Sequence, residues 1–278
     1  MAESRRLRGD IPTIVGATIL AACAVAAIIV PIVAPSSMPA NVVASRFLPP
    51  LARDAGHAMH LLGTDRLGRD VWSRLWEGAR ISLSVGLLTM AISLLIGVAV
   101  GAVAAFVGGA VATALLAVTD FALGVPRVVL LLLLAALWPP SALQVIAVLG
   151  VTGWMPIARL VYADVRAQLG RPYVSGAEAL GAGRFRLLAE HIVPHIAPPV
   201  LAAVTLGIGN AITLEAGLSF LGLGVQPPAA SWGSLIASGR DTVVNAPWVG
   251  LAPGIALVVV VVSCTLIADG LQERSQSA

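Results

Sequence analysis

The sequence predicts an all-α membrane protein whose chain crosses the bilayer several times. Hydrophobic residues make up 58% of its 278 residues and charged residues only 11%, whereas a soluble globular domain carries about 25% charged residues. Apolar runs of the length that a membrane-spanning helix needs, roughly 20 residues, recur along the chain. No stretch supplies enough polar surface to cover a soluble core, so we expect one domain of packed helices.

The first span is expected over Pro12–Ala34, after a short tail that carries three arginines. A cleaved signal peptide is the alternative, because Leu20–Cys23 reads LAAC, which resembles a lipoprotein cleavage site. The apolar run continues past Cys23 to Val33, whereas the apolar region of a cleaved signal is only about 7–15 residues long. We therefore favour an uncleaved helix.

The chain from Ile81 to Thr119 carries no charge and is too long for one span. The sequence FVGG at Phe106–Gly109 divides it, and the paired prolines of WPPS at Trp138–Ser141 predict a turn before the next span. Small residues in GVAVG at Gly97–Gly101 are typical of close helix packing. The six expected spans cover residues 12–34, 81–105, 110–137, 142–161, 196–218 and 246–268.

An even number of spans places both termini on one side of the membrane. Segments 1–11, 162–195 and 269–278 are then cytosolic, and segments 35–80 and 219–245 are extracytoplasmic. Nine arginines lie inside on this topology and seven outside, and the arginines of the N-terminal tail favour a cytosolic N-terminus. We expect a multi-pass protein of a bacterial inner membrane.

The composition also excludes several functions. All 17 basic residues are arginines, and a P-loop needs a lysine on the nucleotide phosphates, as Schiff-base chemistry needs a lysine amine. The chain therefore lacks the equipment for hydrolysing ATP. The net charge of +3 is too small and scattered for nucleic-acid binding, and no metal-ligand spacing is present. Cys23 and Cys264 lie in apolar runs and are expected to be small buried hydrophobes.

One polar insert interrupts the apolar chain, SGAEALGAGRFRLLAEHIVPHIAPP at Ser175–Pro199. Pro172 suits the first turn of a helix and Gly181 its end, so we expect helices at Tyr173–Leu180 and about Gly183–His191. Helices this short are marginal in water and must pack on something. By composition alone, the insert is equally well interpreted as a docking element for a soluble partner or as a solvated loop. Apolar contacts would come from Tyr173, Val174, Ala177, Leu180 and Phe185, and polar ones from Glu178, Arg184 and Arg186.

The stretch from YVSGAEALGAG to HIVP resembles the cytoplasmic signature of binding-protein-dependent ABC-importer permeases. That signature has a Glu-Ala-Ala triplet, then Gly, then Ile and Pro, and Gly181, Ile192 and Pro194 match it. The triplet falls on Ser175–Ala177, with serine in place of glutamate. The resemblance implies an ATPase-docking segment made of Tyr173, Val174, Ser175, Gly176, Ala177, Glu178, Leu180, Gly181, Phe185, Ile192 and Pro194.

Two further stretches, Gly63–Leu83 and Leu218–Gly233, resemble permeases of dipeptide, oligopeptide and nickel importers, most of all their second, C-type subunit. The resemblance spans about His60 to Gly270. It implies a non-catalytic type I permease that pairs with a second homologous permease, two cytosolic ATPases and an extracytoplasmic binding protein. ATP and Mg would bind to the ATPases, and this chain would hold no cofactor. Peptide cargo is expected, with nickel chelates or haem as alternatives.

The extracytoplasmic motifs have structural and functional interpretations. In GTDRLGRD, Gly63, Thr64 and Gly68 would form a tight loop, with Asp65, Arg66, Arg69 and Asp70 available for ion pairs. The following residues 71–80 form an amphipathic pattern that predicts a helix in the membrane interface. The loop Gly222–Gly233 is stiffened by Pro227–Pro228 and would face the binding protein or form a plain surface turn. Its named candidates are Gln226, Pro227, Trp232 and Gly233.

Charges inside spans are costly and often functional. Asp120 and Arg127 are seven residues apart, hence two turns along one side of a helix, and Asn210 and Glu215 belong to the fifth span. These residues either line a translocation path or form pairs between helices. The two interpretations are equally supported for Glu215, and interhelical pairing is favoured for Asp120. His191 and His195 are too few for a metal site and suit helix-end capping. A self-sufficient secondary transporter or a membrane scaffold are the rival function classes.

Overall fold

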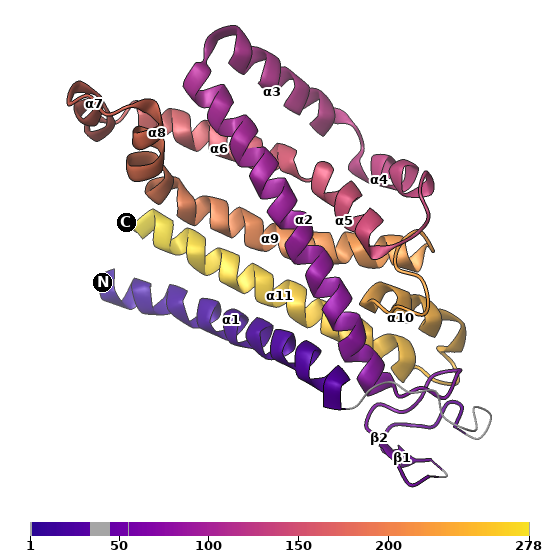
Figure 1. The fold of residues 1–278 in the computed structure, drawn as a ribbon. Helices are drawn as coiled ribbons and strands as arrows, with labels where there is room; N and C mark the ends of the chain where they lie inside the picture. Colours follow the sequence, from indigo (N-terminus) through magenta and orange to yellow (C-terminus); the bar gives the residue numbers. More distant parts are fainter. Residues whose placement is uncertain (1, 34–44, 55, 278) are drawn as a thin grey trace.

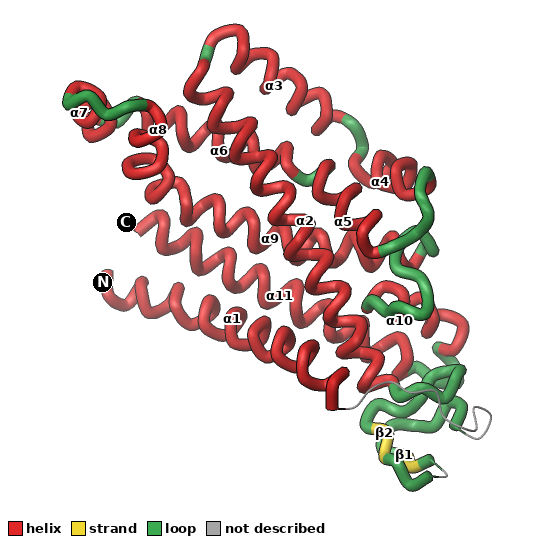
Figure 2. The backbone as a smooth tube through the Cα atoms, viewed as in Figure 1, coloured by secondary structure: helices red, strands yellow, loops and turns green. Residues whose placement is uncertain are grey.

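The computed structural model describes residues 2–33, 45–54 and 56–277, without the side chains of residues 2–10, 185 and 274–277. Most of this chain is helical, and the strands among the described residues form one two-stranded antiparallel hairpin (Figures 1 and 2). The elements are α1 (Ala2–Val33), β1 (Ala52–Arg53), β2 (Met59–His60), α2 (Val71–Val107), α3 (Gly109–Gly124), α4 (Arg127–Ala136), α5 (Ala142–Val151), α6 (Trp154–Leu169), α7 (Pro172–Ala179), α8 (Arg184–Arg186), a π-helix (Leu187–Ile192), α9 (Val193–Phe220), α10 (Trp232–Gly239), a 3₁₀ turn (Arg240–Thr242) and α11 (Trp248–Ser277).

Five helical segments of the described chain are long and apolar enough to cross a membrane, and the count is six if the bent pair α3–α4 forms one span. The all-α, multi-pass class is therefore confirmed. The five segments are Ile11–Val33, Val71–Val107, Ala142–Leu169, Leu187–Phe220 and Trp248–Glu273. Both termini lie at one end of the bundle together with α7, while α10 and the β-hairpin lie at the other end (Figure 1).

The prediction of a separate interfacial helix before the second span is wrong. Residues 71–80 are the first turns of α2, which runs unbroken for 37 residues, or about 55 Å at 1.5 Å per residue. No proline interrupts this stretch, so nothing stops the helix at Arg80. It ends at Val107, because Gly108 and Gly109 take positive φ angles of 67° and 53°, as the FVGG motif predicts.

The third span is not one straight helix either. α3 and α4 meet at an angle of 82°, because Pro126 cannot continue the hydrogen-bonding ladder and Val125 before it is extended. Asp120 and Arg127 therefore lie on different helices and do not share one helix face. The fourth span is also interrupted, between α5 and α6 at Thr152–Gly153, and it reaches Leu169 rather than Val161.

An arginine ties α1 to α2. Pro31 has no N–H group, so the carbonyl of Ala27 one turn earlier loses its helical partner. Arg80 replaces that partner: its Nε donates to the Ala27 oxygen at 2.7 Å and its Nη2 to the Ile28 oxygen at 2.9 Å. α1 also packs closely against α11. A Cβ atom added to Gly16 would lie 2.6 Å from the Ser263 oxygen.

Two glycines allow α2 to cross α6 closely, as the GVAVG motif predicts. A Cβ atom on Gly97 would lie 2.7 Å from Cβ of Ile157, and one on Gly101 would lie 2.5 Å from the Ala158 oxygen. Real Cβ atoms do not approach backbone atoms so closely, so any side chain at Gly101 must push the helices apart. The buried residues around this crossing include Ala102 and Val161.

Replacing Gly101 by valine is expected to destabilise the α2–α6 crossing by about 1–3 kcal/mol, because overpacking forces backbone shifts. The thermal unfolding midpoint of the protein in detergent, followed by tryptophan fluorescence, measures this effect. Ala99→Val on the exposed face of the same helix is the matched control and should unfold like the wild type. Equal midpoints for Gly101→Val and the control would show that the crossing tolerates a side chain.

Candidate functional site

The predicted helix of the polar insert is α7, and its sequence sets both of its ends. Pro172 occupies the first turn, where a missing N–H costs nothing. At the other end, the N–H of Gly181 donates to the Glu178 oxygen at 2.9 Å and that of Ala182 to the Ala177 oxygen at 3.1 Å. This pair of bonds is a Schellman motif, which needs a left-handed residue. Gly181 supplies it with φ 88°.

One face of α7 is buried in the protein's own core. Val174 is 1% exposed and packs in a cluster that includes Leu187 and Ile192 from the π-helix and Val161 and Val165 from α6. The prediction that Val174 and Ile192 contact a docked partner therefore needs correcting. They are the anchor that holds the short helix on the bundle, which a helix of this length requires.

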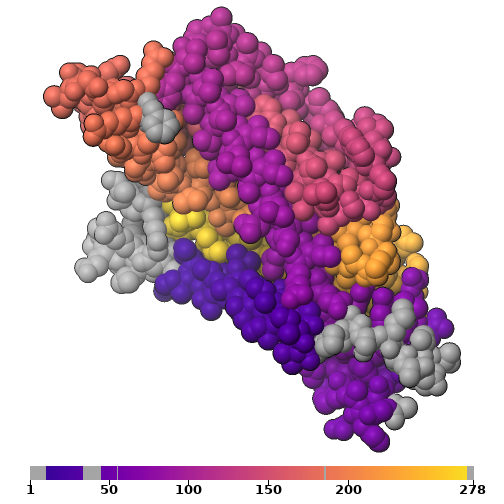
Figure 3. Space-filling model, viewed as in Figure 1, coloured from indigo at the N-terminus to yellow at the C-terminus, as the bar shows by residue number. Residues whose placement is uncertain are grey.

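The opposite face of α7 is exposed and projects from the end of the molecule (Figure 3). Ser175, Gly176 and Glu178 are exposed there, and Leu180 has 90% of its surface open. Glu178 follows Ser175 by one helical turn, so its carboxylate lies on the same face as the serine that replaces the signature glutamate. Leu180 therefore presents an exposed apolar side chain at the end of this otherwise polar face.

Aromatic contacts attach α7 to the start of α9. The ring of Tyr173 stacks on that of His195 with centroids 5.0 Å apart, and its hydroxyl donates to Oε1 of Gln168 at 2.9 Å. Nδ1 of His195 lies 2.8 Å from the His191 oxygen, one turn earlier. This agrees with the interpretation of the two histidines as local helix-end contacts. No group of three or more metal-binding side chains occurs among the described residues.

The second half of the insert is a continuous helical run into the fifth span. The helix predicted at about Gly183–His191 is present as α8 and the π-helix, but it does not end before the fifth span, because α8, the π-helix and α9 follow one another without a loop. Pro194 lies at the junction where the π-helix passes into α9. Arg186 and Glu190 pair at 2.9 Å on the exposed side. The side chain of Phe185 lies outside the described part of the chain.

At the other end of the bundle, GTDRLGRD forms the expected clasp. Gly63 and Gly68 take φ angles of 72° and 74°, and Asp65 pairs with Arg69 at 2.7 Å. Asp65 also accepts hydrogen bonds from two backbone N–H groups of the loop. Thr64 is fully buried and donates to the Ser45 oxygen at 2.6 Å. Arg66 is exposed.

Asp70 ends this clasp and begins α2. Its Oδ2 accepts from the N–H of Ser73 at 2.8 Å as an N-cap, and its Oδ1 lies 2.9 Å from Nδ1 of His60. The β-hairpin that carries His60 is thus attached to the first turn of the second span. Sequence analysis gave no role to His60, because its partner is ten residues away along an irregular loop.

Glu215 lies in a buried polar cluster that we call the outer lock, because it lies toward the end of the bundle opposite the two termini (Figure 1). Its members are Glu215, Ser82, Ser219, Ser231 and Trp232. Glu215 is completely buried, and its carboxylate accepts hydrogen bonds from Ser82 of α2 at 3.0 Å and Ser219 of α9 at 2.6 Å. The N–H of Trp232, at the start of α10, donates to the Ser82 hydroxyl at 3.1 Å. The cluster joins α2, α9 and α10.

Close packing completes the outer lock. Trp232 is fully buried, and its indole N–H donates to the Leu75 oxygen at 3.0 Å. A Cβ atom on Gly233 would lie 2.5 Å from Cα of Ala216, so only glycine fits at this crossing of α10 and α9. Pro227 and Gln226 are exposed in the loop before α10, and Gln226 donates to the Gly222 oxygen at 2.9 Å.

The other intramembrane candidates are not gathered around Glu215. Asp120 pairs with Arg159 of α6, Nε to Oδ1 at 3.0 Å, so it holds α3 against α6. Asn210 is exposed on α9. Arg127 stands at the break between α3 and α4, and its Nε is buried without a hydrogen-bond partner among the described residues. Among these candidates, Asp120 is thus paired with Arg159, Glu215 belongs to the outer lock, and Arg127 has no partner in the described part of the chain.

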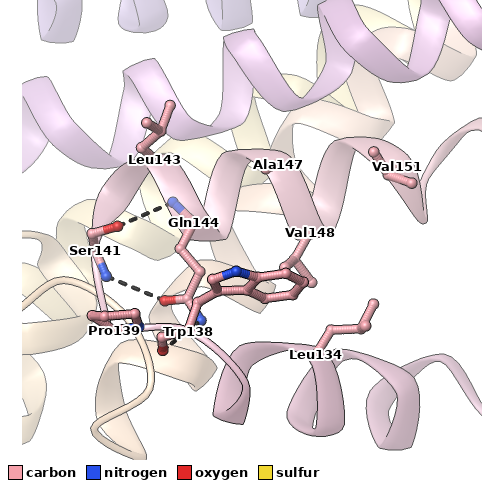
Figure 4. Close-up of a pocket in the computed structure, with 9 residues that line it drawn as sticks. All are labelled: Leu134, Trp138, Pro139, Ser141, Leu143, Gln144, Ala147, Val148 and Val151. Carbon is pink, nitrogen blue, oxygen red and sulfur yellow. Dashed lines mark hydrogen bonds between the residues drawn. The ribbon is translucent and has the colours of Figure 1, made fainter.

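An apolar pocket of about 590 Å³ lies between the end of α4 and α5 (Figure 4). Trp138, Leu134 and Val148 line it. Ser141 and Gln144 use their side chains for the capping box that begins α5, and Nε2 of Gln144 also donates to the Ala135 oxygen. The pocket therefore offers mainly apolar contacts.

Comparison with known proteins identifies relatives among membrane permeases. Residues 97–277 match the family model of the binding-protein-dependent transport system inner membrane component. The dipeptide transport system permease protein DppC of Bacillus subtilis is 35% identical over 270 residues, which cover 97% of this chain and 82% of that protein. The di/tripeptide transport system permease protein DppC of Pseudomonas aeruginosa is 35% identical over 225 residues, 81% of this chain and 74% of that protein.

A chain of the MetNI methionine ABC transporter, solved in inward facing conformations, shares the fold with a TM-score of 0.59 and 18% identity. The match covers 73% of this chain and 95% of that chain. The family model covers α3 to α11 in full and with them the exposed helix α7. This chain belongs to the family of binding-protein-dependent transport system inner membrane components.

Proposed function

We propose that this chain is a membrane-spanning permease subunit of an ATP-driven importer that takes up di- or oligopeptides. The exposed helix α7, anchored by Val174 and carrying Leu180 outward, is the observation that carries the proposal. The chain has no lysine and therefore no P-loop of its own, so ATP-driven transport requires separate ATPase subunits, for which α7 provides an exposed docking element. Two cytosolic ATPase subunits, which bind ATP and Mg, would dock on this chain and on a second homologous permease.

The orientation follows from the same assignment. If α7 meets cytosolic ATPases, both termini are cytosolic as well, because they lie at the same end of the bundle (Figure 1). The arginines of the N-terminal tail support this orientation. The clasp at residues 63–70 and the outer lock then face the extracytoplasmic side, where a binding protein would deliver cargo.

In this proposal the chain transmits force and performs no chemistry. ATP binding draws the two ATPases together, and each moves the helix docked on it. Because Val174, Leu187 and Ile192 are packed into the core around α6 and α9, displacement of α7 carries these spans along and exchanges inward- for outward-facing states. α9 begins beside α7 and is joined by the outer lock to α2 and α10 at its other end, so it extends the movement to the far side.

Peptide cargo is proposed because the similar permeases named above belong to dipeptide and di/tripeptide systems. Nickel chelates or haem would require a different binding protein, and no feature of the described chain favours them. A self-sufficient secondary transporter would need coupling-ion sites at mid-membrane, and Asp120 and Glu215 are already occupied by Arg159 and by serine hydroxyls.

Uptake by the purified complex tests the proposal. The chain with its companion subunits is reconstituted in liposomes that contain ATP, and labelled trialanine is added outside with the binding protein. We expect uptake that requires both ATP and the binding protein and that persists with a proton uncoupler. Uptake that stops with the uncoupler but continues without ATP would support a secondary transporter instead.

A further inference from the structure

Arg127 lies where two interrupted helices meet. It is the first residue of α4, directly after the 82° bend that follows α3. Its Nη2 reaches the second interruption, between α5 and α6, because a Cβ atom on Gly153 would lie 3.3 Å from it. Ser93 of α2 lies beside the same junction and donates to the Gly150 oxygen at 3.0 Å. A fixed positive charge is therefore held inside a cluster of broken helices.

No group of the described chain balances this charge. Asp120, the nearest acid in sequence, is bound to Arg159 at 3.0 Å, and the buried Nε of Arg127 has no hydrogen-bond partner. An unpaired guanidinium inside a membrane is expensive and marks a functional position by default. The start of α4 adds to the positive character, because Pro126 provides no capping side chain and the first N–H groups of a helix are free.

The depth of Arg127 argues against a lipid headgroup as its partner. Gly153 follows Ala142, the first residue of α5, by about 11 residues, which is roughly 17 Å of helix. On the opposite side, Ser93 lies about 14 residues before the end of α2, roughly 21 Å from Val107. An arginine side chain is too short to cover either distance, so its anion must come to mid-membrane.

We propose that Arg127 binds the carboxylate of the cargo while the cargo crosses the membrane. This inference rests on the proposed function and adds the chemical group that the path recognises. A guanidinium accepts a carboxylate through two parallel hydrogen bonds, and half-helix N-termini at mid-membrane are suited to anionic substrate groups. Since Arg127 is half-buried, the side chain is both held in place and reachable. A peptide with a free C-terminus carries the required anion.

The test compares two cargoes that differ only in that anion, trialanine and its C-terminal amide. Uptake of each peptide is measured with the reconstituted complex. The ratio of the uptake rate of the acid to that of the amide is then compared between variants. The same binding protein is used throughout, so its own preference affects all variants equally. For Arg127→Gln we expect the ratio to fall about tenfold or more, the loss typical of a charge-assisted hydrogen-bonded pair. Uptake of the amide should change less than about twofold.

Arg159→Gln is the matched control, because it removes an arginine of the same bundle half that already has a partner. It should alter both peptides equally and leave the ratio unchanged. An unchanged ratio in Arg127→Gln, with peptide uptake intact in the wild type, would overturn the carboxylate site alone. Equal loss of uptake of both peptides, or dissociation of the variant complex on size exclusion, would also overturn the carboxylate site and would assign Arg127 a structural role in the assembly. If the wild type takes up neither peptide, the proposed function and this site both fall.

Discussion

Exchanging Leu180 for aspartate is expected to reduce ATP-driven uptake at least tenfold while the fold stays intact. Leu180 is 90% exposed at the tip of α7, so the folded monomer loses nothing when it becomes polar. A partner that buries this side chain would instead have to bury an unpaired carboxylate, which costs several kcal/mol. Peptide uptake by the reconstituted complex, together with the amount of ATPase that remains bound on purification, measures the effect.

Gly170→Asp provides the matched control for this variant. Gly170 is exposed at the same end of the molecule, with φ −82°, so aspartate fits there and adds the same charge just before α7, at the opposite end of that helix from Leu180. Normal uptake and normal ATPase content in Leu180→Asp would contradict docking through this helix. A normal ATPase content with lost uptake would place Leu180 in force transmission rather than in assembly.

Replacing Glu215 by alanine is expected to lower the free energy of unfolding by about 2–4 kcal/mol. The substitution leaves a cavity in a fully buried site and removes the acceptor for Ser82 and Ser219, and both effects destabilise. The thermal midpoint in detergent should fall, and protease cleavage in the loop before α10 should become faster. Asn210→Ala, at an exposed position of the same helix, should behave like the wild type.

Glu215→Gln separates the two interpretations that the sequence leaves open. Glutamine keeps the shape and one carbonyl acceptor, so a structural lock should retain most of its stability and its transport. A residue that acts in the path through its charge should lose transport at unchanged stability. The second outcome would contradict the outer lock.

Signals that act within a few residues could be read from the sequence. Gly108 and Gly109 end α2, Ser141 begins α5, and Gly181 ends α7, each by local backbone geometry that the residue type favours. The clasp ion pair of Asp65 and Arg69 is equally local. Long apolar runs predicted an all-α membrane protein, because a helix makes all its backbone hydrogen bonds within its own segment when it spans a membrane.

Features that depend on distant partners could not be read in this way. Ser82 and Glu215 are 133 residues apart, and Arg159 and Asp120 are 39 apart, so only the tertiary fold brings them together. The pairing of Asp120 with Arg159 rather than with Arg127 follows from the bend at Pro126, whose angle the sequence does not state. The hydrogen bonds of Arg80 to the Ala27 and Ile28 oxygens likewise join residues 53 and 52 apart.

Identification of the companions of this chain tests the central claim most directly. The protein is purified from native membranes in mild detergent, and its stoichiometric partners are determined by mass spectrometry. The account predicts a second homologous permease and two ATPase subunits, and loss of the ATPases in Leu180→Asp but not in Gly170→Asp. A chain that purifies alone, or as a homo-oligomer without ATPases, would contradict it.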